Sequence, residues 1–392
     1  MKKANSFKTA VLVAIYLLPW GIQCIIQNYL PIYVNSLSFT TEKTIGYVTA
    51  LGAAITALSQ LFWAYFAKRS KNKNNVLALS LFFLAAFSLL FVIENVSRLW
   101  FFVFIILFYS VYMAHQPLVD TIASETYTQT KFSFGFFRSF ASLGYALMPL
   151  AFLLLPSDSP SVFFISAAVL AFVSVFLALL LPKAPKMEIA ETNEQGSKDV
   201  FNSSFVKFLV YTFVLFFIGS ALGAYLPVYY TSQEYLGGSL ESFNIFVSVS
   251  AISEWLLVMA FAYILQKFTP KLAFALVPFF GIFRALPVYL AETPGVAAIS
   301  FVFNALWFGV LWASVTPYIK SLVSSEGNVF AQGVWNVVSM GAGSFLGSFV
   351  CGILAEECGV KNLFLILTLI CVALTVATPF LISNKKESST SL

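Results

Sequence analysis

Twelve apolar stretches, each long enough to cross a lipid bilayer, follow one another along this chain with only short polar breaks between them. A hydrocarbon core of about 30 Å needs roughly 20 apolar residues in helical form. The composition agrees, because 59% of the residues are hydrophobic and only 10% are charged. The sequence therefore predicts an all-α integral membrane protein with twelve transmembrane helices. The expected spans are residues 9–34, 45–67, 76–93, 99–124, 132–155, 161–181, 205–231, 242–266, 272–290, 296–320, 328–355 and 362–383.

The distribution of Lys and Arg predicts how these spans are oriented. When alternate loops are assigned to one side, 17 of the 22 Lys and Arg residues fall with the two termini, and only Lys43, Arg98 and Lys361 face the other side. Cytoplasmic loops carry such an excess, so we expect a multi-pass protein of the cytoplasmic membrane with both termini in the cytoplasm. The net charge of +5 is then a topology signal, and no nucleic-acid partner is expected. The first apolar run is too long for a cleavable signal peptide.

The chain also contains an internal repeat. The segment QNYLPIYVNS at 27–36 resembles GAYLPVYYTS at 223–232, which lies 196 residues later, and a charged stretch at 183–199 separates the two copies. We therefore expect an N-terminal six-helix half at 1–182, a cytoplasmic linker at 183–204 and a C-terminal six-helix half at 205–392. Parallel six-helix repeats are typical of the major facilitator fold, whose substrate site lies between the halves near the bilayer midplane.

Few ionisable side chains lie deep within the predicted spans, namely Asp120, Arg138, Glu254, Arg284 and the single histidine, His115. Each buried charge costs about 2.5 to 3.5 kcal/mol on insertion scales, so it is expected to face a partner or a wet cavity. His115 lies about one and a half helical turns before Asp120 and need not share its face, so the sequence favours a packing histidine held by a hydrogen bond over a functional one.

The spacing of the four charges predicts two pairs. Asp120 and Arg138 each lie nine residues from position 129, and Glu254 and Arg284 each lie fifteen residues from position 269. Antiparallel helices would place each pair at matching depth, roughly 14 Å and 22 Å from its turn. A single pair is equally well explained as a salt bridge that fixes helix register, but two pairs in a duplicated chain favour a functional role. Paired charges of opposite sign favour a neutral, polyhydroxylated ligand.

Two segments resemble one known family. PLVDTIASE, followed by FSFGFFRSFASLGYAL, and the stretch at 28–70 are similar to the oligosaccharide:proton symporters of the lactose permease type. The resemblance implies sugar-binding roles for Asp120 and Arg138, with Tyr145 as the stacking aromatic residue. It also implies that Glu254 and Arg284 match the family's charged pair of the eighth and ninth helices.

The sequence departs from the family pattern at several functional positions. The family's histidine and glutamate of the tenth helix fall at Asn304 and Trp307, and its second arginine of the fifth helix falls at Phe136. The asparagine near the eighth-helix acid is Leu257, and the acidic residue after the second helix is Lys68. Proton coupling, if present, would therefore require Glu254, Asp120 or His115.

These observations predict a secondary active transporter that imports a neutral sugar or glycoside by alternating access with proton coupling. A permease of the same fold for a nucleoside, an aromatic acid or a drug is the alternative. We expect no enzyme activity, cofactor or metal site, because the sequence has no nucleophile and base constellation, no phosphate-binding loop and no paired cysteines. The expected substrate-binding residues are Asp120, Arg138, Tyr145, Glu254 and Asn304. The expected proton-coupling residues are Glu254, Arg284 and His115.

Overall fold

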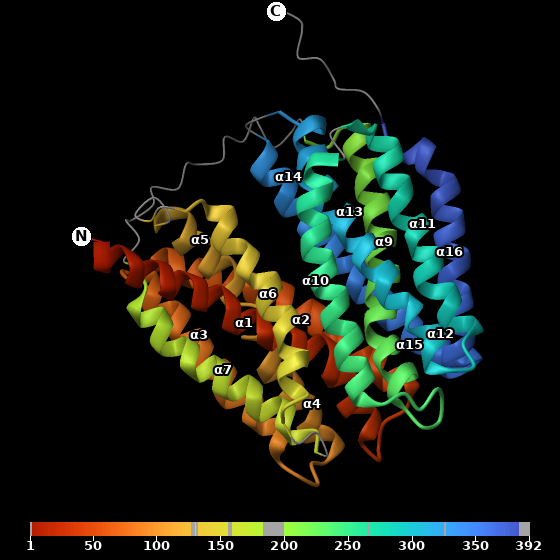
Figure 1. Ribbon diagram of the computed structural model, residues 1–392, viewed down its shortest axis with the longest axis horizontal. Helices are drawn as coiled ribbons and strands as arrows, with labels where there is room; N and C mark the ends of the chain where they lie inside the picture. The colour runs from red at the N-terminus through yellow and green to blue at the C-terminus, as the bar shows by residue number, and fades with distance from the viewer. Residues whose placement is uncertain are drawn as a thin grey trace, which may run out of the picture. The chain divides into compact units, whose positions relative to one another are not determined.

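The computed structural model describes residues 2–126, 130, 132–155, 159–182, 200–264, 267–324 and 327–383. All regular structure in these residues is helical (Figure 1). Most of the predicted linker and the turn position 129 lie outside them. By contact density the described chain divides into two compact units. Unit 1 holds the described residues within 1–40, 51–187 and 239–252, and unit 2 holds those within 41–50, 188–238 and 253–392.

Unit 1 is built from the helices of the first half of the chain. Its elements are α1 (Lys2–Ser36), most of α2 (Glu42–Arg69), α3 (Lys73–Ser88), the short η1 (Leu89–Val92), α4 (Arg98–Tyr109), α5 (His115–Thr126), α6 (Phe134–Phe152) and α7 (Ser161–Leu180). The first nine residues of α2 belong to unit 2, and the first thirteen residues of α10 belong to unit 1. The boundaries predicted for the two halves stay a prediction.

Unit 2 is built from the helices of the second half. Its elements are α9 (Ser203–Thr231), the remainder of α10 (Leu240–Ile264), α11 (Pro270–Leu290), α12 (Pro294–Ala297), α13 (Ile299–Leu322), α14 (Asn328–Trp335), η4 (Asn336–Gly343), α15 (Ser344–Cys358) and α16 (Val360–Leu381). The segment η4 has π-helical hydrogen bonding, so α14, η4 and α15 form one long helix with a widened middle.

Ten helices in the described residues are long and apolar enough to cross a membrane. Two further predicted spans correspond to α6 and to the pair α4 and α5. The fourth span, 99–124, is not one continuous helix, because residues 110–114 form turns between α4 and α5. Hydropathy measures the length of an apolar run and not the continuity of its hydrogen bonds, so this break was not predicted.

Equivalent helices pack together in the two units. In unit 1, α1 packs against α6 and α7, and α3 packs against α7. In unit 2, α9 packs against α15 and α16, as α1 does against α6 and α7. Helix α11 packs against α16, as α3 does against α7 (Figure 1). The repeated packing pattern agrees with the sequence repeat and indicates that the two halves share one design.

A glycine allows the closest helix contact in each unit. A Cβ atom at Gly144 of α6 would overlap the backbone of Leu17 in α1, and one at Gly347 of α15 would overlap the backbone of Phe217 in α9. Small residues permit such backbone approach in membrane helices. The approach of α6 to α1 matters for the site described next, because it sets side chains of α1 beside those of α6.

Candidate functional site

Helix α1 presents an aromatic and polar face to the interior of unit 1. Tyr16 and Trp20 lie one turn apart, and Gln23 and Gln27 continue the same face toward the helix C-terminus. Tyr16 is fully buried and Trp20 is only 4% exposed, whereas Gln27 is exposed. The buried part of this face therefore packs against neighbouring helices, and the exposed amide requires water or a polar ligand.

Asp120 of α5 and Arg138 of α6 contact each other, as their spacing predicts. Nε of Arg138 lies 3.6 Å from Oδ1 of Asp120. Tyr16 donates a hydrogen bond from its hydroxyl to the same Oδ1 atom at 2.7 Å. Within the described part of the chain, Oδ2 of Asp120 receives no hydrogen bond. The carboxylate is thus fixed through one oxygen and leaves the other open.

Trp20 supports the arginine of this pair. Cζ of Arg138 lies over the indole ring, 5.0 Å from its centroid, which is the geometry of a cation–π interaction. The ring of Trp20 also packs against Tyr16, with centroids 5.3 Å apart. The two terminal nitrogens of Arg138 make no hydrogen bond to any residue that the structure describes. The guanidinium is therefore held by its plane and its Nε atom, with its outer donors unused.

His115 packs against the far side of the site, on the ring of Trp20. Its ring is 1% exposed and meets the Trp20 ring edge-on, with centroids 5.1 Å apart. Neither of its ring nitrogens has a hydrogen-bond partner among the described residues. His115 packs as a buried ring, without the hydrogen bond expected of a packing histidine. A role in proton coupling stays a prediction.

Tyr145 extends the site along α6, seven residues and so two turns beyond Arg138 on the same face. Asn28 of α1 donates a hydrogen bond to the Tyr145 hydroxyl at 2.9 Å and to the Cys24 carbonyl at 3.0 Å. Tyr145 is thus linked to α1 through its hydroxyl. We call the set Tyr16, Trp20, Asp120 and Arg138 the N-cluster, and Tyr145 lies next to it along α6.

A second charged group lies within unit 2. Arg284 of α11 is only 4% exposed, and its Cζ lies 5.9 Å and 5.3 Å from the ring centroids of Trp307 and Phe308 in α13. Glu254 of α10 is half-buried in the same unit, and its pairing with Arg284 stays a prediction. We call Glu254, Arg284, Trp307 and Phe308 the C-cluster.

Asn304 belongs to the same region of unit 2. It lies on α13, one turn before Trp307 and Phe308, and is half-buried. Trp307 is 1% exposed, so its ring fills the interior at the position where the resemblance noted in the sequence implies a glutamate. A buried tryptophan cannot titrate, which leaves Glu254 as the carboxylate of the C-cluster.

The sequence missed two members of the N-cluster, Tyr16 and Trp20. Their spacing of one turn, continued by two glutamines, was a signal for a polar face on the first span. The signal was weak, because the chain has 17 tyrosines and 7 tryptophans. No group of three or more His, Cys, Asp or Glu side chains that could hold a metal lies in the described ranges.

Comparison with known proteins decides the family. The sequence model of the MFS_1 like family matches residues 10–366, which is most of the chain. This protein belongs to the MFS_1 like family. The MFS_1 like protein is therefore a multi-pass secondary transporter with the major facilitator fold.

Individual relatives are distant but span the whole chain. The maltose permease of Geobacillus stearothermophilus is 23% identical over 363 residues, which cover 92% of this chain and 91% of the permease. The structure of the nucleoside transporter NupG superposes with a TM-score of 0.81 at 17% identity and covers 96% of this chain and 100% of NupG. A D-xylose-proton symporter superposes with a TM-score of 0.72 at 13% identity, over 99% and 100% of the two chains. All three are transporters rather than enzymes.

Proposed function

We propose that this protein imports a neutral polyhydroxylated molecule, a sugar or a glycoside, by alternating access together with a proton. The observation that carries the proposal is the contact between Asp120 and Arg138. Their side chains are 31% and 37% exposed, so both can reach a ligand. The open Oδ2 atom of Asp120 can accept hydrogen bonds, and the terminal nitrogens of Arg138 can donate them. A ligand with adjacent hydroxyl groups uses both.

Charge balance supports a neutral ligand. Asp120 and Arg138 compensate each other, so a bound anion or cation would add a charge that this pair does not balance. Charge-assisted hydrogen bonds are about twice as strong as neutral ones, which suits recognition of hydroxyl groups in a wet cavity. Tyr145, which the family resemblance implies as the stacking residue, is partly exposed two turns along the same helix face.

Glu254 is our candidate for the proton carrier, with Arg284 as its electrostatic partner. A carboxylate in a membrane interior is expensive and commonly belongs to an ion or proton pathway. Arg284 is held over two aromatic rings and in the proposed pair its charge acts on Glu254, so protonation of Glu254 would change the charge balance of the C-cluster. Asn304 and His115 are assigned supporting roles in binding and coupling, respectively.

A nucleoside is the second candidate substrate. It too is neutral, and its ribose offers adjacent hydroxyl groups to the same acid and arginine. The fold similarity to NupG, with a TM-score of 0.81, favours its inclusion. The maltose permease and the D-xylose-proton symporter favour the sugar.

The test is a pH recording from a lightly buffered suspension of expressing cells during addition of monosaccharides, oligosaccharides and nucleosides. Alkalinisation with a sugar is expected, because symport carries protons into the cell. Arg138→Gln should abolish the signal, and Lys71→Gln, which removes an equal charge from an exposed loop, should retain it. Alkalinisation with nucleosides alone would transfer the assignment to the second candidate. A flat trace together with background uptake of every labelled compound would refute both.

Orientation in the cytoplasmic membrane is also part of the proposal. The excess of Lys and Arg in alternate loops supports cytoplasmic termini. A fluorescent protein that becomes fluorescent only in the cytoplasm should be bright when it is fused at position 392. It should be dark when the chain is truncated at position 235, in the loop after α9, and the fluorescent protein is fused there. The reverse pattern would invert the topology.

A further inference from the structure

The break in the fourth span lies directly before the helix that carries His115 and Asp120. Residues 110–114 form turns between α4 and α5, so the regular hydrogen-bonding pattern of the span is interrupted there. Non-helical backbone at membrane depth is tolerated only where its polar groups are satisfied by protein or water. The partners of these backbone groups therefore determine how α5, and Asp120 with it, is held.

Local hydrogen bonds satisfy part of the break. The amides of Ser110 and Tyr112 donate to the carbonyls of Ile106 and Phe108, at 3.0 Å each. The Ser110 hydroxyl donates to the Leu107 carbonyl at 2.6 Å. These contacts complete the last turn of α4. They leave the carbonyl of Ser110 to be satisfied from another helix.

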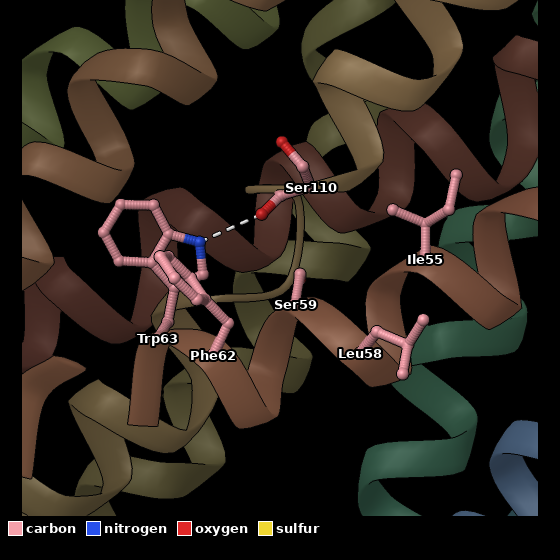
Figure 2. A pocket seen from close by; sticks show the side chains of 6 residues that line it. All are labelled: Ile55, Leu58, Ser59, Phe62, Trp63 and Ser110. Atoms are coloured by element: carbon pink, nitrogen blue, oxygen red, sulfur yellow. Dashed lines mark hydrogen bonds between the residues drawn. The ribbon is translucent and has the colours of Figure 1, made fainter. Parts of the chain in front are cut away.

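Two side chains of α2 donate hydrogen bonds to backbone carbonyls in the break. Trp63 donates its indole N–H to the Ser110 carbonyl at 2.9 Å (Figure 2). Gln60 donates from Nε2 to the Met113 carbonyl at 3.3 Å. Gln60 and Trp63 are three residues apart, so they project from the same face of α2. Trp63 is 6% exposed and Ser110 is half-buried, so the hydrogen bond between them is partly buried.

A pocket of about 320 Å³ adjoins these contacts (Figure 2). It is lined by Ile55, Leu58, Ser59, Phe62, Trp63 and Ser110. Leu58 and Phe62 are exposed and Ser110 is half-buried, so the pocket is open to the outside of the protein and the break is not covered by protein on this side. The hydrogen bonds from Trp63 and Gln60 therefore contribute more to its position than they would in a fully packed interior.

We infer that Trp63 and Gln60 are positioning residues that hold the broken fourth span so that α5 presents Asp120 to the transported ligand. The inference builds on the proposed function, since it assigns the two side chains to the ligand site through Asp120. Neither side chain belongs to the N-cluster. The first nine residues of α2 belong to unit 2, where Lys43 forms a 2.5 Å ion pair with Glu356. A shift of α2 would therefore move residues 110–114 through the two hydrogen bonds, and with them α5 and Asp120.

The experiment uses the full-length protein in membranes with Ser124→Cys as a reporter. Ser124 is exposed and lies one turn beyond Asp120 on the same face of α5. The rate of its alkylation by N-ethylmaleimide is measured alone and combined with Trp63→Phe, with Gln60→Leu or with the control Phe62→Leu. Phe62 lines the pocket but donates no hydrogen bond. The protein without Ser124→Cys corrects for the natural cysteines.

Trp63→Phe and Gln60→Leu are each expected to change the alkylation rate about tenfold, because each leaves one backbone carbonyl of the break without its hydrogen-bond donor from α2. Phe62→Leu should leave it unchanged. In transport, both variants should raise KM for the substrate found in the pH assay, with a smaller effect on maximal rate. A merely destabilised protein would instead lose maximal rate with its amount in the membrane.

Alkylation rates within about twofold of the parent in both α2 variants would overturn the inference, whatever the substrate. Equal changes in Phe62→Leu would also overturn it, because they would reflect loss of packing at the pocket. If the alkylation rate changes but no sugar or nucleoside gives a pH signal or labelled uptake, the proposed substrate class is refuted and the role of α2 is upheld. If Trp63→Phe does not reach the membrane, the Gln60→Leu result decides.

Discussion

The N-cluster and the C-cluster contain the same pair of charges in different surroundings. In the N-cluster the acid and the arginine touch at 3.6 Å, both are about one-third exposed, and Tyr16 fixes one carboxylate oxygen. In the C-cluster the arginine is 4% exposed and lies over the rings of Trp307 and Phe308. One repeat therefore offers its charges outward, and the other encloses its arginine.

The difference suggests a division of labour between the repeats. Exposed, partly unused hydrogen-bonding atoms suit recognition of a ligand that enters and leaves. The enclosed Arg284 suits the proposed change of protonation at Glu254, because a charge in a low-dielectric interior is sensitive to its partner. The comparison would fail if the same substitution had the same effect in both clusters.

Arg138→Gln is expected to have the largest effect. It removes the outer donors for the ligand and leaves Asp120 without its positive partner. Hydrogen bonds to charged groups contribute about 1.5 to 3 kcal/mol each, so two lost bonds should lower transport about a hundredfold or more. Initial uptake of labelled substrate measures this, with Lys71→Gln as the control. Should Arg284→Gln weaken substrate binding equally, the proposed division of labour would be wrong.

Glu254→Gln should separate binding from coupling. Because glutamine cannot release a proton, accumulation of substrate against its gradient should cease. Exchange of internal for external substrate needs no net proton movement, and we expect its rate to stay within about threefold of the parent. Counterflow and concentrative uptake in the same vesicles measure the two. Substrate-driven proton uptake that survives in Glu254→Gln would remove Glu254 from the coupling pathway.

Gly144→Ala tests whether the contact of α6 with α1 sets the geometry of the N-cluster. The added methyl group would overlap the Leu17 backbone, and overpacking of this kind costs roughly 1 to 3 kcal/mol. Thermal unfolding in detergent should therefore occur at a lower temperature than for the parent. Gly219→Ala is the control, because a Cβ atom at Gly219 meets nothing within 4 Å. Equal melting temperatures for Gly144→Ala and the parent would contradict the contact.

Tyr16→Phe is expected to have the smallest effect. It removes only the hydroxyl that donates to Oδ1 of Asp120 and keeps the ring packed on Trp20. A typical hydrogen bond contributes about 1 kcal/mol, so KM should rise about fivefold with little change in maximal rate. Tyr33→Phe serves as the control, because the Tyr33 hydroxyl makes no hydrogen bond within the described chain. Indistinguishable KM values for the two variants would exclude Tyr16 as a positioning residue.

Local spacing made part of the site predictable. Asp120 and Arg138 sit at equal distances from one turn, and antiparallel helices of regular rise bring such residues to the same depth. The same arithmetic pairs Glu254 with Arg284, and this second pairing stays a prediction. It did not predict that Arg284 would lie over Trp307 and Phe308, because α13 reaches α11 only through tertiary packing.

The remaining members of the site come from distant parts of the chain. Tyr16 and Asp120 are 104 residues apart in sequence, and Trp63 and Ser110 are 47 apart. No periodicity within one span reports a contact with another span. The break at 110–114 was hidden for the same reason, because the side chains that satisfy it belong to α2.

The sequence by itself determined the membrane class, the number of spans, the internal repeat and the pairing of Asp120 with Arg138. Each of these depends on run length, helical rise or similarity along the chain, which are local properties of the sequence. Tertiary structure alone decided which oxygen of Asp120 is occupied, which ring supports Arg138 and where the fourth span breaks. Those features depend on the distances between helices, which are set by backbone approach at residues such as Gly144 and by hydrogen bonds between spans.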